Sequence, residues 1–101
     1  MKYIFNTSGD YVAFVYGTNL FTPSGDWLGF ILNGNEVFSS TDSSFLGRVS
    51  SDDRIVRNLL DGARLRPLRP LRPLRPLIPL RPLRRLRMYR LNFPWVDVFE
   101  P

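Results

Sequence analysis

The sequence predicts an all-β protein, in which a small antiparallel meander closes into a shallow pseudo-fourfold barrel and a polyproline-II-like Arg-Pro-Leu segment follows. The barrel rests on a repeated phrase, Phe-x-x-Ser-Gly-Asp-aromatic, which begins at Phe5 and again at Phe21. Self-similarity at a fixed spacing marks repeated supersecondary units. The following segment rests on Arg-Pro-Leu triplets over residues 65–87. Proline at every third position excludes helix and the interior of a sheet.

Each copy of the phrase predicts two strands joined by a turn. The first copy has a short strand ending at Phe5, a Ser-Gly-Asp turn and a longer apolar strand over residues 11–16. The second copy repeats this arrangement, with its longer strand over residues 27–32. Glycine supplies the positive φ that such turns need, and Asn33-Gly34 is a strong type I′ hairpin signal. A looser third copy runs over residues 38–47.

The fourth copy is incomplete in the sequence. Residues 55–58 resemble its start, but no Ser-Gly-Asp phrase follows them. The best candidate to complete it is a strand over residues 86–91, after the triplets. We therefore divide the chain into a repeat-built barrel domain, residues 1–60, and a Pro/Arg/Leu tail with an aromatic C-terminal segment, residues 61–101, which we expect to pack on the barrel.

Strict alternation predicts that the longer strands have two apolar faces. In the first copy, Tyr11, Ala13 and Val15 then share one face, and the side chains between them share the other. One face lines the core, and the other needs a cover, which the tail, a partner subunit or a lipid can supply, since large exposed apolar patches are rare on solitary soluble proteins. The candidate ligand-binding residues are Val12, Phe14, Tyr16, Trp27, Leu28 and Phe30.

A small residue recurs at Ala13, Gly29 and Gly47, where it permits tight curvature and close approach across a narrow barrel. The full pattern, Phe-x-x-Ser-Gly-x-aromatic-aliphatic-(Ala/Gly)-Phe, repeats through residues 5–58 and precedes a basic triplet tail. In this it resembles the 4-fold beta flower family of small bacterial proteins. The resemblance covers almost the whole chain and implies a shallow pseudo-fourfold barrel with an apolar central surface. It implies no particular activity.

The triplet period sorts the tail side chains into three stripes, because polyproline II has three residues per turn. Leucines occupy every third position from Leu65 to Leu86, with arginines and prolines forming the other two stripes. An unbroken leucine stripe favours an ordered rod that docks through its leucines on the barrel or on a second rod. A disordered linker is the alternative for Pro-rich sequence. At the C-terminus, Trp95 and Phe99 are expected to anchor the chain on an apolar surface.

The composition excludes several chemistries. The chain has no cysteine and no histidine, which removes disulfides, thiolate-ligated zinc, cysteine nucleophiles and a Ser-His-Asp triad. Asp10, Asp26 and Asp42 recur near the same turn of each copy, where turn formation explains them better than oxygen ligation of a cation. We therefore predict a protein that is not an enzyme and has no catalytic residues, no cofactor and no metal.

The charge of the chain is divided. Residues 1–60 carry four basic and six acidic side chains, and residues 61–101 carry ten and three. Such asymmetry predicts a partner that is an anionic surface or polyanion. The candidate residues for a lipid headgroup or polyanion are Arg66, Arg69, Arg72, Arg75, Arg81 and Arg84. The PxxPx(Arg) pattern of SH3 ligands also occurs in the tail, but any Arg-Pro-Leu repeat produces it.

These features together predict a non-catalytic binding protein that contacts anionic lipid or a hydrophobic ligand through an apolar barrel face and an Arg/Leu-striped rod. Two alternatives remain open: a structural or assembly module that forms homo-oligomers, and a nucleic-acid binder that uses the arginine stripe. Without a signal peptide of the usual form, the expected location is cytoplasmic, and the lipid-binding prediction adds a peripheral position at the membrane.

Overall fold

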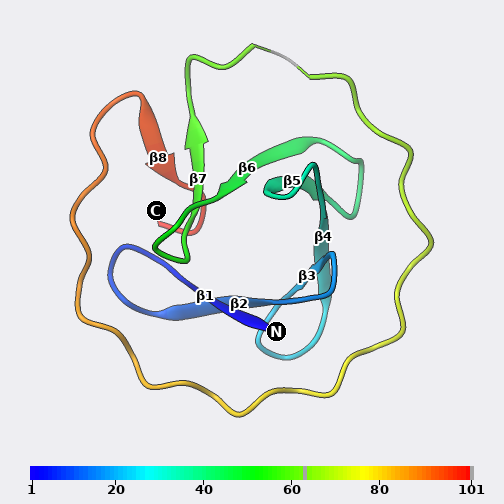
Figure 1. The fold of residues 1–101 in the computed structure, drawn as a ribbon, viewed down its shortest axis with the longest axis horizontal. Helices are drawn as coiled ribbons and strands as arrows, with labels where there is room; N and C mark the ends of the chain where they lie inside the picture. The colour runs from blue at the N-terminus through cyan, green and yellow to red at the C-terminus, as the bar shows by residue number, and fades with distance from the viewer. Residues whose placement is uncertain (63, 101) are drawn as a thin grey trace.

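A computed structural model describes residues 1–62 and 64–100 and confirms the all-β fold. Eight strands form one antiparallel sheet in sequence order, and the sheet curls into an open barrel (Figure 1). The strands are β1 (Lys2–Phe5), β2 (Tyr11–Tyr16), β3 (Asn19–Phe21), β4 (Trp27–Leu32), β5 (Glu36–Ser39), β6 (Phe45–Val49), β7 (Ile55–Asn58) and β8 (Trp95–Asp97). Aromatic and β-branched residues fill most of these strands, as sheet packing favours.

The strands form four hairpins, and the fourth is completed differently from the sequence prediction. Residues 59–94 connect β7 to β8, whose Asp97 lies opposite Val56, so residues 95–97 complete the fourth unit. The predicted strand over residues 86–91 is wrong. The chain there donates its backbone N–H groups to the first turn instead, from Arg85 to the carbonyl of Gly9 at 3.0 Å and from Met88 to that of Thr7 at 2.8 Å.

Side chains close the seam between β1 and β8, which are the two ends of the sheet. The backbone N–H and the hydroxyl of Thr7 both donate to Oδ2 of Asp97, each at 2.8 Å. Next to them, the Ser8 hydroxyl donates to Glu100 at 2.6 Å. The loop before β7 also reaches β1, because the N–H of Phe5 donates to the carbonyl of Asp53 at 2.9 Å. The barrel is therefore closed by loops and by the C-terminal residues.

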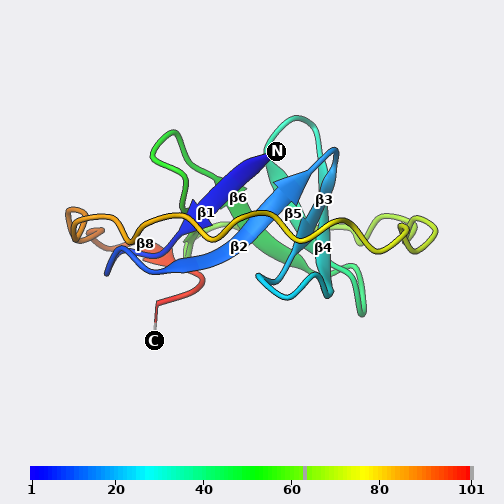
Figure 2. The same ribbon diagram turned by 90° about the horizontal axis from the view of Figure 1, so that it is seen from below.

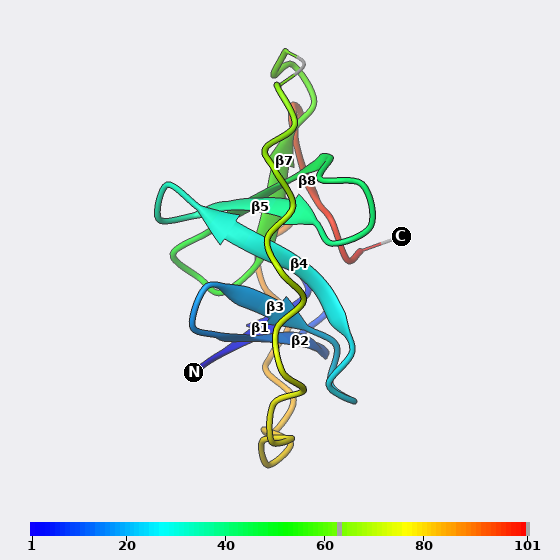
Figure 3. The ribbon, with the colours of Figure 1, turned by 90° about the vertical axis from the view of Figure 1, so that its right-hand side faces the viewer.

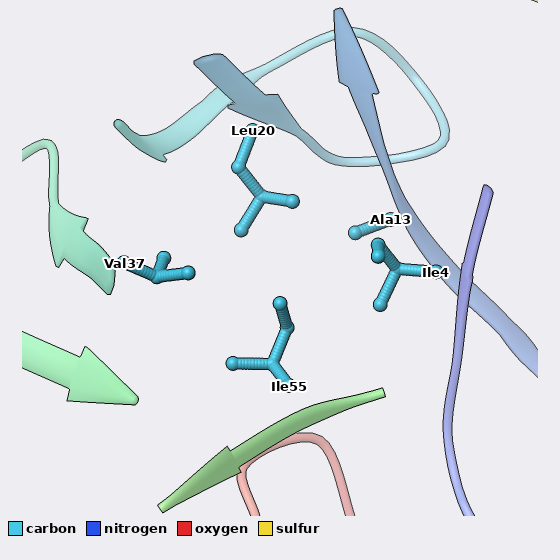
Figure 4. Close-up of a cluster of buried hydrophobic side chains, with 5 residues drawn as sticks. All are labelled: Ile4, Ala13, Leu20, Val37 and Ile55. Carbon is cyan, nitrogen blue, oxygen red and sulfur yellow. The ribbon is translucent and has the colours of Figure 1, made fainter. Parts of the chain in front are cut away.

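A β-bulge occurs at the same place in three units and changes which side chains face the core. In each pair the register skips one residue, so that Val12, Leu28 and Leu46 are the extra residues. These bulge residues pack against the central cluster, which contains Ile4, Ala13, Leu20, Val37 and Ile55 (Figure 4). The strict alternation predicted for residues 11–16 is therefore wrong, because a bulge turns two successive residues toward the same side.

The small residues beside the bulges allow strands to approach closely, as expected. A Cβ added to Gly29 would overlap the carbonyl oxygen of Phe38 on the next strand. A Cβ on Gly47 would overlap the carbonyl oxygen of Val56 in the same way. Any larger residue at these positions would push neighbouring strands apart and open the curl of the sheet.

Residues 64–92, which we call the belt, run around the outside of the barrel (Figures 1 and 2). The belt has no helix and no strand, and Figure 3 shows it passing outside β3, β4 and β5. The molecule is a disc of 37 × 35 × 21 Å, and the belt lies close to its widest plane. Exposure repeats every three residues, with leucines open and most prolines half-buried, as expected for polyproline-II-like chain.

The belt does not dock through its leucines, as its leucine stripe had suggested. The eight leucines of its triplets, Leu65 to Leu86, are 88–96% exposed and point away from the barrel. The physical reason lies in the barrel, whose outer side offers aromatic rings and turn carboxylates. Guanidinium groups bind both of these partners, whereas leucine binds neither specifically.

Candidate functional site

The most prominent surface feature is a row of leucines along the outer edge of the belt. We call it the leucine ring, and it consists of Leu65, Leu68, Leu71, Leu74, Leu77, Leu80, Leu83 and Leu86. Burying a leucine side chain is worth about 1.5–3 kcal/mol relative to leaving it in water. Eight such side chains held open on a small protein form an exposed apolar surface larger than solitary soluble proteins usually carry.

Three ion pairs, one at each aspartate turn of the repeated phrase, hold the belt, and a further pair joins Arg85 to Asp53 in the turn before β7 at 2.8 Å. Arg66 pairs with Asp42 at 3.9 Å, and Arg75 pairs with Asp26 at 3.3 Å. The third pair joins Arg84 and Asp10 at 3.2 Å. These arginines recur every nine residues, or three triplets, so the belt advances by roughly 28 Å from one turn to the next in polyproline II geometry. The belt thus passes the three turns in the reverse of their sequence order.

Other belt arginines lie on aromatic rings. The guanidinium carbon of Arg69 is 5.2 Å from the ring centroid of Trp27, and that of Arg81 is 5.6 Å from Tyr11. Arg85 lies 4.0 Å from the ring of Phe5. Such cation–π contacts contribute about 0.5–1 kcal/mol each at exposed sites. Aromatic residues next to the turns therefore bind arginines of the belt and help to hold it on the barrel.

The six arginines predicted to meet a polyanion divide accordingly. Arg66, Arg69, Arg75, Arg81 and Arg84 all contact the barrel, and among the described residues Arg72 forms no ion pair or ring contact. The arginine side chains in the ion pairs remain 64–67% exposed, so a competing anion can still reach them.

Of the predicted ligand-binding residues, most serve the fold. Phe14 stacks on Phe21 with ring centroids 5.4 Å apart, and Phe30 stacks on Phe38 at 5.7 Å. Both Phe14 and Phe30 are almost fully buried. Val12 and Leu28 are the bulge residues on the core.

The other two predicted ligand-binding residues lie near the belt. Trp27 donates from Nε1 to Oδ1 of Asn19 at 3.1 Å, beneath Arg69. Tyr16 is the most open of the six, at 62% exposure.

Tyr16 lines a groove of about 560 Å³ between the β2–β3 hairpin and the belt. The groove is walled by Tyr16, Gly17, Thr18, Asn19 and Phe21 on the barrel side and by Pro73, Leu74, Arg75, Pro76 and Leu77 on the belt side. Its volume lies within the roughly 300–1,000 Å³ of ordinary ligand sites. Two of its walls, Leu74 and Leu77, belong to the leucine ring. The groove thus opens directly onto that surface.

A buried ionic network anchors the end of the belt, and the sequence analysis missed it. Arg54 is 6% exposed and donates from Nε and Nη2 to Asp52, at 3.0 and 2.5 Å. Its Nη1 donates to the Thr7 hydroxyl at 3.0 Å and to the carbonyl of Tyr89 at 2.9 Å. The neighbouring guanidinium lowers the pKa of the Asp52 carboxyl below its usual value. The sequence signal for this network is the spacing of Asp52 and Arg54 just before a strand, because side chains two residues apart in an extended chain lie on the same side.

Two further groups have altered acidities. Hydrogen bonds from Ser44 lower the pKa of Asp42, the partner of Arg66. Burial raises the pKa of Tyr11, whose hydroxyl has no hydrogen-bond partner within the described part of the chain. Asp42 thus remains ionised in the pair that holds the start of the belt.

Comparison with known proteins gives one match. The model of a family described as 4-fold beta flower protein matches residues 2–93, which include the whole belt. The chain matches none of the curated proteins and none of the solved structures with which it was compared. Over residues 1–62 and 64–100, no helix is long and apolar enough to cross a membrane.

Proposed function

The chain belongs to the 4-fold beta flower family, and on that premise we propose that it is a non-catalytic protein that binds anionic membrane surfaces through the leucine ring. The observation that carries the proposal is the 88–96% exposure of all eight ring leucines on a protein with a net charge of +5. Outward leucines next to arginines are suited to a membrane surface, where the leucines can enter the apolar acyl-chain region and the arginines can stay near the anionic headgroups.

The expected strength is that of a reversible peripheral protein. The disc is almost round, at 37 × 35 Å, so a flat bilayer meets only an arc of the ring. An arc of roughly three leucines offers about 4–9 kcal/mol if fully buried, before the cost of immobilisation. Arginines near an anionic surface add about 1 kcal/mol each, and salt screens this attraction.

Self-association is the second candidate, because the ring surrounds the disc and one membrane leaves much of it uncovered. Copies packed side by side would cover the leucines on every side. Nucleic-acid binding has less support, since Arg66, Arg75 and Arg84 already have aspartate partners that a phosphate would have to displace. A hydrophobic ligand other than lipid would have to use the groove beside Tyr16.

The test is co-sedimentation with vesicles of neutral lipid and of neutral plus anionic lipid. We expect binding that requires anionic lipid and weakens with salt. The matched variant replaces alternate ring members, Leu68, Leu74, Leu80 and Leu86, by serine. Each inserted leucine that is lost should cost about tenfold in affinity.

The four leucines point away from the barrel, so the variant should melt as the wild type does. Wild-type binding by the serine variant would contradict the proposal. Light scattering on the same samples measures self-association, and monomers that ignore vesicles would exclude both candidates.

A further inference from the structure

The leucine ring is not uniform, because one arc of it lacks an arginine. Elsewhere an arginine accompanies each leucine, but Ile78 stands where the repeat calls for arginine, so residues 76–80 carry no charge. Ile78 is 52% exposed, and its Cδ1 lies over Gly25, where an added Cβ would sit 2.6 Å away. This arc therefore combines exposed leucines with the longest uncharged stretch of the belt.

The opposite arrangement holds toward the end of the belt. Residues 81–90 contain Arg81, Arg84, Arg85, Arg87 and Arg90, more than any other stretch of equal length. Guanidinium groups resist transfer into hydrocarbon. An arc so rich in arginine can lie at headgroup level but is poorly suited to insertion.

The groove beside Tyr16 opens at the start of the uncharged stretch, and its wall is largely apolar, with Thr18, Asn19 and Arg75 as its polar members. Leu74 and Leu77 form part of its wall, and the pyrrolidine rings of Pro73 and Pro76 add further apolar surface. On the barrel side, a Cβ added to Gly17 would meet no atom within 4 Å, so the hairpin leaves open space there. Tyr16 supplies an exposed aromatic ring, a side chain that favours the membrane interface.

We propose that the bilayer meets one arc of the ring, from Leu74 to Leu80, and that the groove beside it takes up one acyl chain of a lipid. This proposal rests on the membrane binding proposed above. Arg75 and Arg81 bracket the uncharged stretch, and their positive charges, held near the barrel by Asp26 and by the Tyr11 ring, attract lipid phosphates on either side. The apolar wall and the volume of about 560 Å³ suit a hydrocarbon chain.

Single-site labelling tests the arc, because the chain has no cysteine of its own. An environment-sensitive fluorophore is attached to Leu77→Cys and, as the matched control, to Leu68→Cys; these leucines are 95% and 96% exposed. On vesicles containing anionic lipid, we expect a blue shift of emission at position 77 and little shift at position 68. Equal shifts, or no shift in a protein that sediments with vesicles, would overturn the arc and leave membrane binding standing. Failure to sediment at all would overturn both.

Fluorescence quenching tests the acyl chain. Trp27 is bonded to Asn19, a wall of the groove, so in a Trp95→Phe variant its emission reports on the groove interior. A nitroxide on the lipid acyl chain should quench Trp27 more strongly than a nitroxide on the headgroup. Equal or weaker quenching by the chain nitroxide would overturn the groove assignment. If Trp95→Phe fails to fold, as judged by circular dichroism, Trp95→Tyr replaces it.

Discussion

The side chain of Arg84 forms an ion pair with Asp10, with 3.2 Å between Nε and Oδ1, and the same arrangement recurs where Arg75 meets Asp26 and Arg66 meets Asp42. Arginines spaced by nine residues thus match turns spaced by sixteen. Between Arg66 and Arg84, no hydrogen bond joins the backbone of the belt to the backbone of the barrel within the described ranges. Side chains therefore fix the position of most of the belt.

Replacing Asp10, Asp26 and Asp42 together by asparagine should loosen the belt without unfolding the barrel. The belt would lose these three ion pairs, while the core clusters would stay intact. We expect faster cleavage within the belt by a protease of broad specificity, and high salt should have a similar effect on the wild type. Asp61→Asn is the control, since among the described residues the one ion pair of Asp61 is with nearby Arg64. Equal cleavage of the triple variant and the wild type would show that the pairs do not hold the belt.

Stability should fall in acid because of Asp52. Its pKa is lower in the folded state than in the unfolded state, chiefly because Arg54 donates hydrogen bonds to it. The contribution is therefore fully present above the unfolded value near 3.9 and is lost as pH falls through the lower folded value. Urea unfolding between pH 7 and pH 3 measures this loss. Asp52→Asn should flatten that part of the pH profile, and an unchanged profile would contradict the assignment.

Gly9→Ala should destabilise the protein more than Gly17→Ala. Both glycines have positive φ, +92° and +63°, so alanine adds backbone strain of about 1–2 kcal/mol at either position. At Gly9 the new Cβ would also overlap the carbonyl oxygen of Arg85, whereas at Gly17 it would meet nothing. Urea unfolding of the two variants isolates the belt contact as their difference. If both variants lose the same free energy of unfolding, the belt must move away from the new Cβ at Gly9 without loss of stability.

Tyr11→Phe should leave stability unchanged or raise it by up to about 1 kcal/mol. The Tyr11 hydroxyl is buried and has no partner among the residues described, so its removal relieves an unsatisfied polar group. Tyr3→Phe is the matched control, because the Tyr3 hydroxyl donates to the carbonyl of Leu80 on the belt. That variant should lose about 0.5–1.5 kcal/mol. A larger loss for Tyr11→Phe than for Tyr3→Phe would show that Tyr11 has a partner.

The repeat was sufficient to predict the strands, the turns and the small residues, because each depends on local backbone geometry. The inward packing of Val12 and Leu28 was not predictable by alternation, since a bulge depends on how two strands pair rather than on either strand alone. β8 escaped prediction because it has three residues and pairs with a strand on the far side of the belt in sequence.

The orientation of the belt shows another limit of reasoning from sequence. A period of three identified the stripes correctly, but it left open which stripe faces the barrel. The free energy of burying leucine favoured leucines that face the barrel. In the structure the arginines face it instead, because Trp27, Tyr11 and the turn aspartates bind guanidinium groups. The bulges decide which side chains of the barrel face outward, so the residues that contact the belt could not be predicted from strict alternation.

The position of the belt inside the fourth hairpin has a consequence for how the molecule assembles. β8 is synthesised only after the whole belt, and its pairing with β7 closes a loop of chain that surrounds the barrel. Closing so long a loop lowers the conformational entropy of the chain, and this loss comes late in folding, when the first three hairpins can already have formed. Pairing of β8 with β7 thus fixes the end of the belt. A chain that ends before β8 would leave the belt unattached at that end and the edge of β7 unpaired, and an unpaired sheet edge promotes aggregation.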